Sequence, residues 1–223
     1  MNIMNIISRI YFFIGSLVCH QIPERTIYID GKPLPLCARD TGIYLGIFIA
    51  LIYCIVRGKL KADKLPSTRN GILLVLLTVP MMIDAVSSYA SVRQTDNTIR
   101  LVTGLFFGMP IALLLIPAAN YKVYGTNKLK VIDSRLDLLL LVFINVFASF
   151  VILKFGIPTW WLLATACIVG LVFLISRIAY TVLKLLNTGN EKTRIVYSLI
   201  ITMAFFMILY IFKYHMLRWI IQN

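Results

Sequence analysis

The sequence predicts an all-α protein, a polytopic transmembrane bundle of about seven helices. Its 223 residues are 60% hydrophobic and only 14% charged, whereas soluble domains are about a quarter charged. Residues 101–121, 155–176 and 195–212 carry no charged side chain, and about 20 helical residues cross a bilayer core of about 30 Å. Because these runs lack the alternation of barrel strands, and only helices or closed barrels satisfy the backbone in lipid, they are predicted to be helices.

The remaining helices are predicted from shorter apolar runs. Three of these runs, at residues 41–56, 71–83 and 138–153, are extended by polar neighbours. The first segment, 3–18, contains Arg9 and lacks the small-residue cleavage site of a signal peptide. We interpret it as a retained seventh helix with Arg9 near the interface. The chain shows no internal repeat, so residues 1–223 are expected to form a single transmembrane domain.

The distribution of Lys and Arg predicts the topology in the cell membrane. Basic residues cluster in the connections 57–69, 122–135 and 184–194, which share one side if seven helices alternate. The positive-inside rule makes that side cytoplasmic, with the N-terminus inside and the C-terminus outside. The polar segments 19–40 and 87–100 are then extracytoplasmic. Because the net charge of +13 is explained by these flanks, membrane lipids are expected partners and nucleic acid is not.

Two glycine pairs predict where helices approach closely. Gly42 and Gly46 open the second apolar helix, and Gly104 and Gly108 lie in the fourth. Small residues four apart let helix backbones come together. We expect these two helices to pack beneath the polar segments.

The first polar segment combines metal-ligating side chains with turn residues. Its three prolines and Asp30-Gly31 predict an extended, compact loop that returns Cys19 and His20 toward Cys37 and Asp40. Sulfur, imidazole and carboxylate are acceptable ligands for zinc or iron. A disulfide between Cys19 and Cys37 is an equally good interpretation in an oxidising compartment, and free thiols are the third.

The second polar segment predicts an anion site. In a helix that begins near Ser91, the residues Arg93, Asn97 and Arg100 share one face, with Thr103 adjoining. Two arginines, an amide and a hydroxyl at a membrane interface suit a phosphate or a carboxylate. Asp84 is embedded in apolar sequence, so it is either functional or paired with Arg93 or Arg100. We expect the 19–37 loop to touch the start of the 93–100 helix.

Three stretches resemble a known family. CHQIPER, PLCARDTGIYLG and IDAVSSYASVRQTDNTIRLVTGLFFG are similar to hallmark segments of the DUF2085 family of predicted membrane proteins, over residues 18–110. The family pattern runs CHQ-x-P-x-R-[ST], PLCARCTG-x-Y-x-G, DG-x-x-Q and R-x-[ST]-x-N-x-x-R-x-x-TG. The resemblance implies a membrane fold but no settled activity. By position it implies these site candidates: Cys19, His20, Gln21, Arg25, Cys37, Arg39, Asp84, Arg93, Asn97, Arg100 and Thr103.

The chain departs from that pattern at two places. Asp40 stands where the family has a third cysteine, which leaves an oxygen in place of a thiolate. Ala85 and Ser88 replace the glycine and the glutamine of the aspartate motif. These departures indicate either altered chemistry or a retained fold without the original activity.

Three functions remain open. The first is an enzyme on an anionic lipid or a polyprenyl-linked substrate, with Asp84, Arg93, Asn97 and Arg100 as catalytic candidates. Its substrate would bind Arg39, Arg93, Arg100 and Thr103, and a zinc or iron ion would bind Cys19, His20, Cys37 and Asp40. The second is a transporter or channel for a small ion or metabolite. The third is a scaffold or assembly subunit whose outer loop is held by a disulfide.

Overall fold

The computed structural model describes residues 3–122, 124–155 and 159–222. Within them the chain forms seven α-helices, one turn of 3-10 helix and a two-stranded sheet. The helices are α1 (Ile3–Val18), α2 (Ala38–Val56), α3 (Thr68–Tyr89), α4 (Asn97–Asn120), α5 (Arg135–Phe155), α6 (Trp160–Leu185) and α7 (Glu191–Gln222). The short turn η1 (Pro23–Arg25) precedes the strands β1 (Thr26–Ile29) and β2 (Lys32–Cys37). The prediction of an all-α bundle is confirmed, and the extended loop proves to be a β-hairpin.

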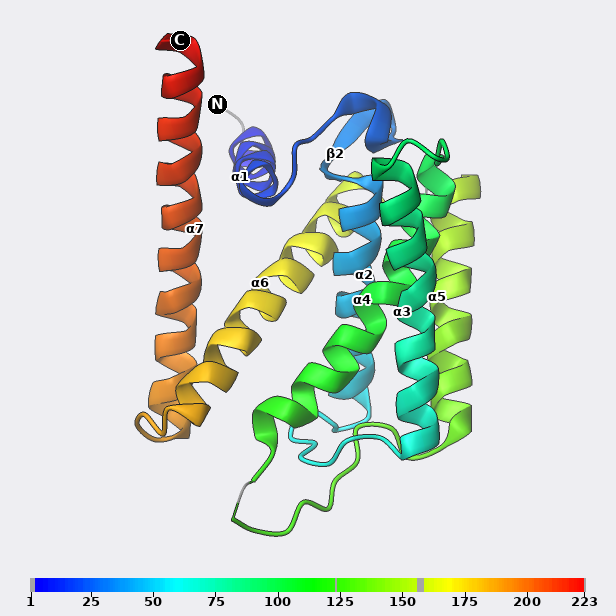
Figure 1. Cartoon of the computed structure of the whole chain (residues 1–223), viewed down its shortest axis with the longest axis vertical. Helices are drawn as coiled ribbons and strands as arrows, with labels where there is room; N and C mark the ends of the chain where they lie inside the picture. The colour runs from blue at the N-terminus through cyan, green and yellow to red at the C-terminus, as the bar shows by residue number, and fades with distance from the viewer. Residues whose placement is uncertain (1–2, 123, 156–158, 223) are drawn as a thin grey trace.

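Six helices, α2 to α7, are long and apolar enough to span a membrane. They alternate in direction, so the connections after α2, α4 and α6 lie together at the bottom of Figure 1. The β-hairpin and the α3–α4 turn lie at the top, as does the C-terminus. We call the top the hairpin end and the bottom the loop end. The protein is therefore built as a multi-pass membrane protein.

Helix α1 does not run through the bundle. Figure 1 shows it nearly end-on beside β2, across the direction of the other helices. At about 1.5 Å per residue its 16 residues extend about 24 Å, short of a bilayer core. Lys213 of α7 donates to the carbonyl of Ser16 at 3.0 Å, and Tyr11 contacts Thr165 of α6 at 2.9 Å. The predicted location of the termini on opposite sides requires residues 3–18 to cross the membrane, and it stays a prediction.

Helices α2 and α4 pack backbone against backbone, as the glycine pairs predicted. A Cβ atom added to Gly104 would lie 2.5 Å from the carbonyl oxygen of Arg39, and one on Gly46 or Gly108 would collide with the facing helix. Helix α6 contacts α2 in the same way, since a Cβ on Gly170 would collide with the carbonyl of Tyr44. Only glycine permits these approaches. The pair α2–α4 therefore forms a fixed frame under the hairpin.

The hairpin is held on this frame by burial and by hydrogen bonds. Ile29, Leu34 and Leu36 are buried in one apolar cluster with Leu101 and Leu105 of α4. Two side chains from other helices bind carbonyls of the hairpin and of η1. Trp160 Nε1 donates to Pro33 of β2 at 2.8 Å, and Asn97 Nδ2 donates to Glu24 of η1 and to Thr26 of β1 at 3.2 and 3.3 Å. These contacts hold the hairpin backbone against α4 and α6.

Candidate functional site: an arginine-lined pocket beside two thiols

Asp84 is the buried centre of charge at the hairpin end. It lies in the last turns of α3, with its side chain only 1% exposed. Its Oδ2 accepts from Arg39 Nη2 at 2.6 Å, and its Oδ1 accepts from Arg93 Nη2 at 3.2 Å. The ion pair considered with Arg100 is absent from the described contacts, and Arg39 of α2 takes that place. Because both of its oxygens accept hydrogen bonds and its side chain is almost fully buried, Asp84 is placed to orient Arg39; its catalytic role stays a prediction.

Three arginines from three elements line one pocket of about 230 Å³, which we call the arginine pocket. Arg25 comes from η1, Arg39 from α2 and Arg100 from α4. The rest of the polar lining consists of Cys19, His20, Gln21, Cys37, Asp40 and the hydroxyl-bearing Tyr89. The guanidinium of Arg39 also stacks over the Tyr89 ring, 5.9 Å from its centroid. The pocket therefore combines a surplus of fixed positive charge with thiol and carboxylate groups.

A neighbouring pocket of about 390 Å³ shares Arg25 and Arg100 with the arginine pocket. Arg93 lines this second space, together with Glu24 and Gln94. Arg93 is half exposed while it binds Asp84. Four arginines thus surround two adjoining spaces at the hairpin end.

Two predicted site residues have structural partners instead. Asn97 holds the hairpin through the two carbonyls named above, and its Oδ1 accepts from Arg100 Nη1 at 3.2 Å. Thr103 donates its hydroxyl to the carbonyl of Ile99 at 2.7 Å, inside its own helix. Neither residue lines the arginine pocket. The predicted contact between the 19–37 loop and the start of α4 is confirmed by Asn97.

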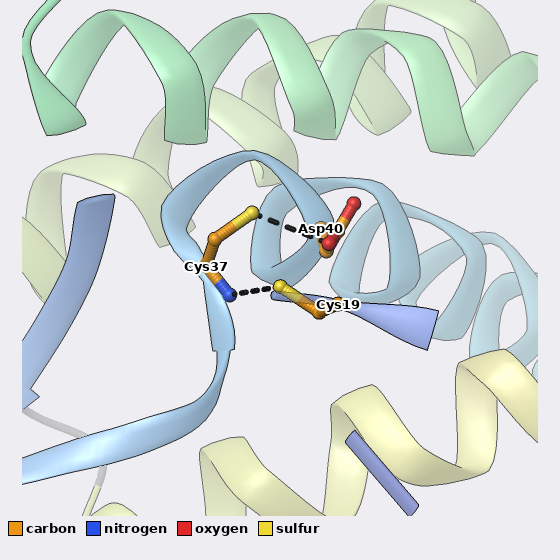
Figure 2. A group of neighbouring side chains, drawn as sticks. All are labelled: Cys19, Cys37 and Asp40. Carbon is orange, nitrogen blue, oxygen red and sulfur yellow. Dashed lines mark hydrogen bonds between the residues drawn. The ribbon is translucent and has the colours of Figure 1, made fainter. Parts of the chain in front are cut away.

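The two cysteines of the loop meet Asp40 at the start of α2 (Figure 2). One ligand atom from each of Cys19, Cys37 and Asp40 lies within 4.8 Å of the other two. The Cys37 thiol donates to Asp40 Oδ2 at 3.2 Å, and the Cys37 backbone N–H donates to Cys19 Sγ at 3.2 Å. Both cysteines are unbridged. His20 is exposed and stands outside this group, although it lines the same pocket.

The two thiols differ in acidity because one hydrogen bond joins them. The Cys19 thiol donates to the sulfur of Cys37, which holds the pKa of Cys37 below its usual value. The same hydrogen bond, together with burial and the Asp40 carboxylate, raises the pKa of Cys19. Cys37 is therefore the more easily deprotonated of the two thiols.

Three residues that line the pocket were given no catalytic, substrate-binding or metal-binding role in the sequence analysis: Gln21, Arg25 and Tyr89. Gln21 Nε2 donates to the carbonyls of Phe12 and Pro35 at 2.9 and 2.8 Å, so it ties α1 to β2. Gln21 and Arg25 stand in the CHQ-x-P-x-R pattern, and that pattern was the available signal. Nothing in the sequence singles out Tyr89, which reaches the pocket only through the packing of α3 on α4.

Comparisons with known proteins cover this same region. A family model described as a predicted membrane protein (DUF2085) matches residues 19–114, from Cys19 into α4. An uncharacterised protein of Methanocaldococcus jannaschii is 30% identical over 127 residues, which are 57% of this chain and 80% of the relative. An uncharacterised protein of Methanothermobacter thermautotrophicus is 36% identical over 98 residues, which are 44% of this chain and 83% of the relative. No solved structure matches the chain.

Both relatives are shorter than this chain, and the family match ends before α5. The matched segment contains Arg25, Arg39, Arg100 and the Cys19–Cys37–Asp40 group. The site is thus built almost entirely from the segment that the family model matches. On this likeness, the chain belongs to the DUF2085 family of predicted membrane proteins.

Proposed function

We propose that this protein is a membrane enzyme that binds the anionic headgroup of a lipid-linked substrate in the arginine pocket. One observation carries the proposal: Arg25, Arg39 and Arg100 converge on one small space in which Asp40 is the one carboxylate among the described lining residues. Guanidinium groups bind phosphate and carboxylate oxygens through paired, charge-assisted hydrogen bonds. A phosphate-bearing headgroup fits that charge.

The arrangement of Arg39 supports a bound anion. Asp84 fixes one end of its guanidinium, whereas its Nε is buried without a hydrogen-bond partner among the described residues. An unsatisfied buried donor costs about 1–3 kcal/mol. An oxygen of a bound headgroup, or a water molecule beside it, would satisfy that donor.

An apolar groove beside the arginine pocket supports a lipid-linked substrate. A space of about 440 Å³ between the end of α1 and α7 shares Val18, Cys19, His20 and Gln21 with the arginine pocket. Its opposite wall is formed by Leu209, Phe212 and Met216 of α7. An acyl or prenyl chain can lie in this groove while its headgroup reaches the arginines, because the two spaces meet at the 18–21 link.

The chemistry on the headgroup would come from the groups that line the same pocket. Cys37 and Asp40 stand beside the arginines, and Cys37 is the more acidic of the two thiols. A thiolate and a carboxylate can act on the headgroup directly, as nucleophile and general base, or can together hold a metal ion that acts on it in their place. Asp84 keeps a positioning role through Arg39.

The hairpin end is proposed to face the extracytoplasmic side. The three connections at the loop end carry Lys and Arg throughout, which is typical of cytoplasmic loops. Single cysteines introduced at exposed positions test this: a membrane-impermeant maleimide should label Lys32→Cys in intact cells and label Lys61→Cys only after lysis. The reverse pattern would place the arginine pocket in the cytoplasm.

A transport role is less well supported. Directly below the pocket, α2 and α4 meet through Gly42, Gly46, Gly104 and Gly108 without space between their backbones. The surrounding residues of this layer, such as Leu101 and Leu105, are buried and apolar. A polar path through the bundle would have to open this contact.

Native mass spectrometry of the detergent-purified protein tests the proposed function. Polyprenyl phosphate should bind, whereas the matching polyprenol and inorganic phosphate should bind far more weakly. Arg25→Gln and Arg100→Gln should each weaken polyprenyl phosphate binding by about tenfold or more, since a charge-assisted hydrogen bond contributes about 1.5–3 kcal/mol. Arg69→Gln, at an exposed site at the loop end, is the matched control. Equal binding of the phosphate and the alcohol would contradict the proposal.

A further inference from the structure

We propose that Cys19, Cys37 and Asp40 are the three protein ligands of one divalent transition-metal ion, and that zinc is the ion they fit best. The site deepens the proposed function, and its contact with a headgroup rests on that function. The ligand set differs from the sequence expectation because the exposed imidazole of His20 lies outside the group.

The distances suit a common metal. The three ligand atoms lie within 4.8 Å of one another. Zinc binds thiolate sulfur at about 2.3 Å in tetrahedral geometry, which separates two sulfur ligands by about 3.8 Å. Side-chain rotations that shorten the separation between ligand atoms by about 1 Å would bring the three atoms to the distances of a metal site. Two sulfurs and one oxygen disfavour magnesium and calcium, which select oxygen ligands.

The backbone holds the ligands in place without the ion. Cys37 precedes α2 and Asp40 lies in its first turn, so their spacing of three residues puts both side chains on one face. Cys19 follows α1, and its backbone N–H donates to the carbonyl of Gly15 at 2.9 Å. The Cys37 N–H points at Cys19 Sγ, as Figure 2 shows. An N–H donor stabilises negative charge on a sulfur atom, which a metal-bound thiolate carries.

The charges around the group also favour a bound cation. Among the described residues Asp40 forms no ion pair, although Arg25, Arg39 and Arg100 line the same pocket. Two thiolates and a carboxylate carry three negative charges, which a divalent ion and the nearby arginines balance. The half-buried Asp40 carboxylate is thus available to a metal.

Three protein ligands leave one tetrahedral position for water or substrate, as in catalytic zinc sites. All three ligands line the arginine pocket. A headgroup held by the arginines would therefore lie next to the ion, and the ion would polarise one of its oxygens.

Elemental analysis of the intact, detergent-purified chain tests the site. We expect one zinc per chain, lost in Cys37→Ser and in Cys19→Ser but retained in His20→Ala and in Cys54→Ser, whose thiol is buried in the α2 core. Loss of zinc in His20→Ala would overturn the three-ligand assignment. A Cys19–Cys37 disulfide, or two titratable thiols without metal, would overturn the site altogether.

Cobalt(II) provides a readout that does not depend on how well the serine variants fold. Cobalt added to chelator-treated wild-type protein should produce a thiolate-to-metal absorption band. Asp40→Asn should weaken cobalt binding, and Asp40→Cys should strengthen the band; unchanged spectra in both variants would remove Asp40 as a ligand. If metal is absent while Arg100→Gln still weakens polyprenyl phosphate binding, the metal site fails and the proposed function stands. If zinc is bound but Arg100→Gln leaves polyprenyl phosphate binding unchanged, the metal site stands and the proposed function fails.

Discussion

The two membrane ends of this protein use their basic residues differently. At the loop end three carboxylates are each paired with a different basic residue: Asp137 with Arg57 at 2.6 Å, Asp133 with Lys59 at 2.7 Å and Asp63 with Lys122 at 3.7 Å. Lys184 there donates to the last carbonyls of α4, at Ala119 and Tyr121. These contacts tie loops to helices and cap a helix end.

At the hairpin end only two of the four arginines bind the buried carboxylate of Asp84. Asp84 binds Arg39 and Arg93, whereas Arg25 and Arg100 form no described ion pair and face the pocket with Arg39. Basic residues at the loop end are explained by topology and structure, but at the hairpin end their positive charge is concentrated in a concave space. The contrast teaches that basic residues indicate a candidate anion site only where they gather in a concave space without carboxylate partners.

The largest expected effect tests the frame under the hairpin end. Gly104→Leu places a side chain against the carbonyl of Arg39 and should prevent α2 and α4 from packing, because overpacking costs about 3 kcal/mol or more where backbone must move. Gly71→Leu is the control, since a Cβ there has open space near the loop end of α3. Thermal unfolding in detergent should show little or no folded Gly104→Leu and a nearly unchanged midpoint for Gly71→Leu. Equal midpoints would mean that the α2–α4 contact is not close.

The next effect compares the carboxylates of the two ends. Asp84→Asn leaves Arg39 buried without a counterion and should lower the free energy of unfolding by about 3–5 kcal/mol. Asp133→Asn removes a carboxylate that is 53% exposed and should cost about 1 kcal/mol or less. Unfolding in SDS measures both values. Similar decreases in the free energy of unfolding in the two variants would contradict the difference between the carboxylates of the two membrane ends.

A smaller effect concerns the support of the hairpin. Asn97→Ala removes two hydrogen bonds, one to η1 and one to β1, and should cost about 1–2 kcal/mol. Hydrogen exchange should rise in residues 24–37 and stay unchanged in the loop that follows α4. If exchange does not change but polyprenyl phosphate binding is abolished, Asn97 contacts the ligand directly and its structural role is wrong.

The smallest effect is local and depends on pH. Burial acts to raise the pKa of Asp63, but hydrogen bonds from the backbone of Leu129 and Lys128 outweigh it, so the pKa lies below its usual value. A depressed carboxyl pKa stabilises the folded state above the usual value of 3.8, and that stabilisation is lost as the pH falls through the lower value in the folded protein. Below that pH, acid-stable proteases should cut the loop after α4 faster, while Asp63→Asn should be cut faster at neutral pH too. If the rate of proteolysis is the same at low pH and in Asp63→Asn as in the wild-type protein at neutral pH, Asp63 does not hold this loop.

Much of the fold could be predicted because apolar length directly determines membrane helices. The six spanning helices and the close α2–α4 contact follow from apolar runs and from glycine spacing. The position of α1 could not be predicted, since a 16-residue apolar segment with one arginine suits either a short span or a helix lying across the bundle. The contacts of Tyr11 with α6 and of Ser16 with α7 place this helix across the bundle.

The candidate site was predictable by residue type but only in part by pairing. The predicted ion pair of Asp84 with Arg93 is confirmed, but Asp84 also binds Arg39, which lies 45 positions away and was not predicted as its partner. Such pairings depend on how α2 packs beside α3 and α4, which no local pattern encodes. For the same reason Thr103 and Asn97, on the expected helix face, have backbone partners instead.

The crosswise position of α1 has a practical consequence for assigning sidedness. With six crossings and a first helix that stays at the hairpin end, reporter domains fused to either end of the chain would sit in the same compartment. A seventh crossing would separate them. One pair of fusions, scored for activity inside or outside the cell, therefore distinguishes the two architectures and shows which side of the membrane the hairpin end faces.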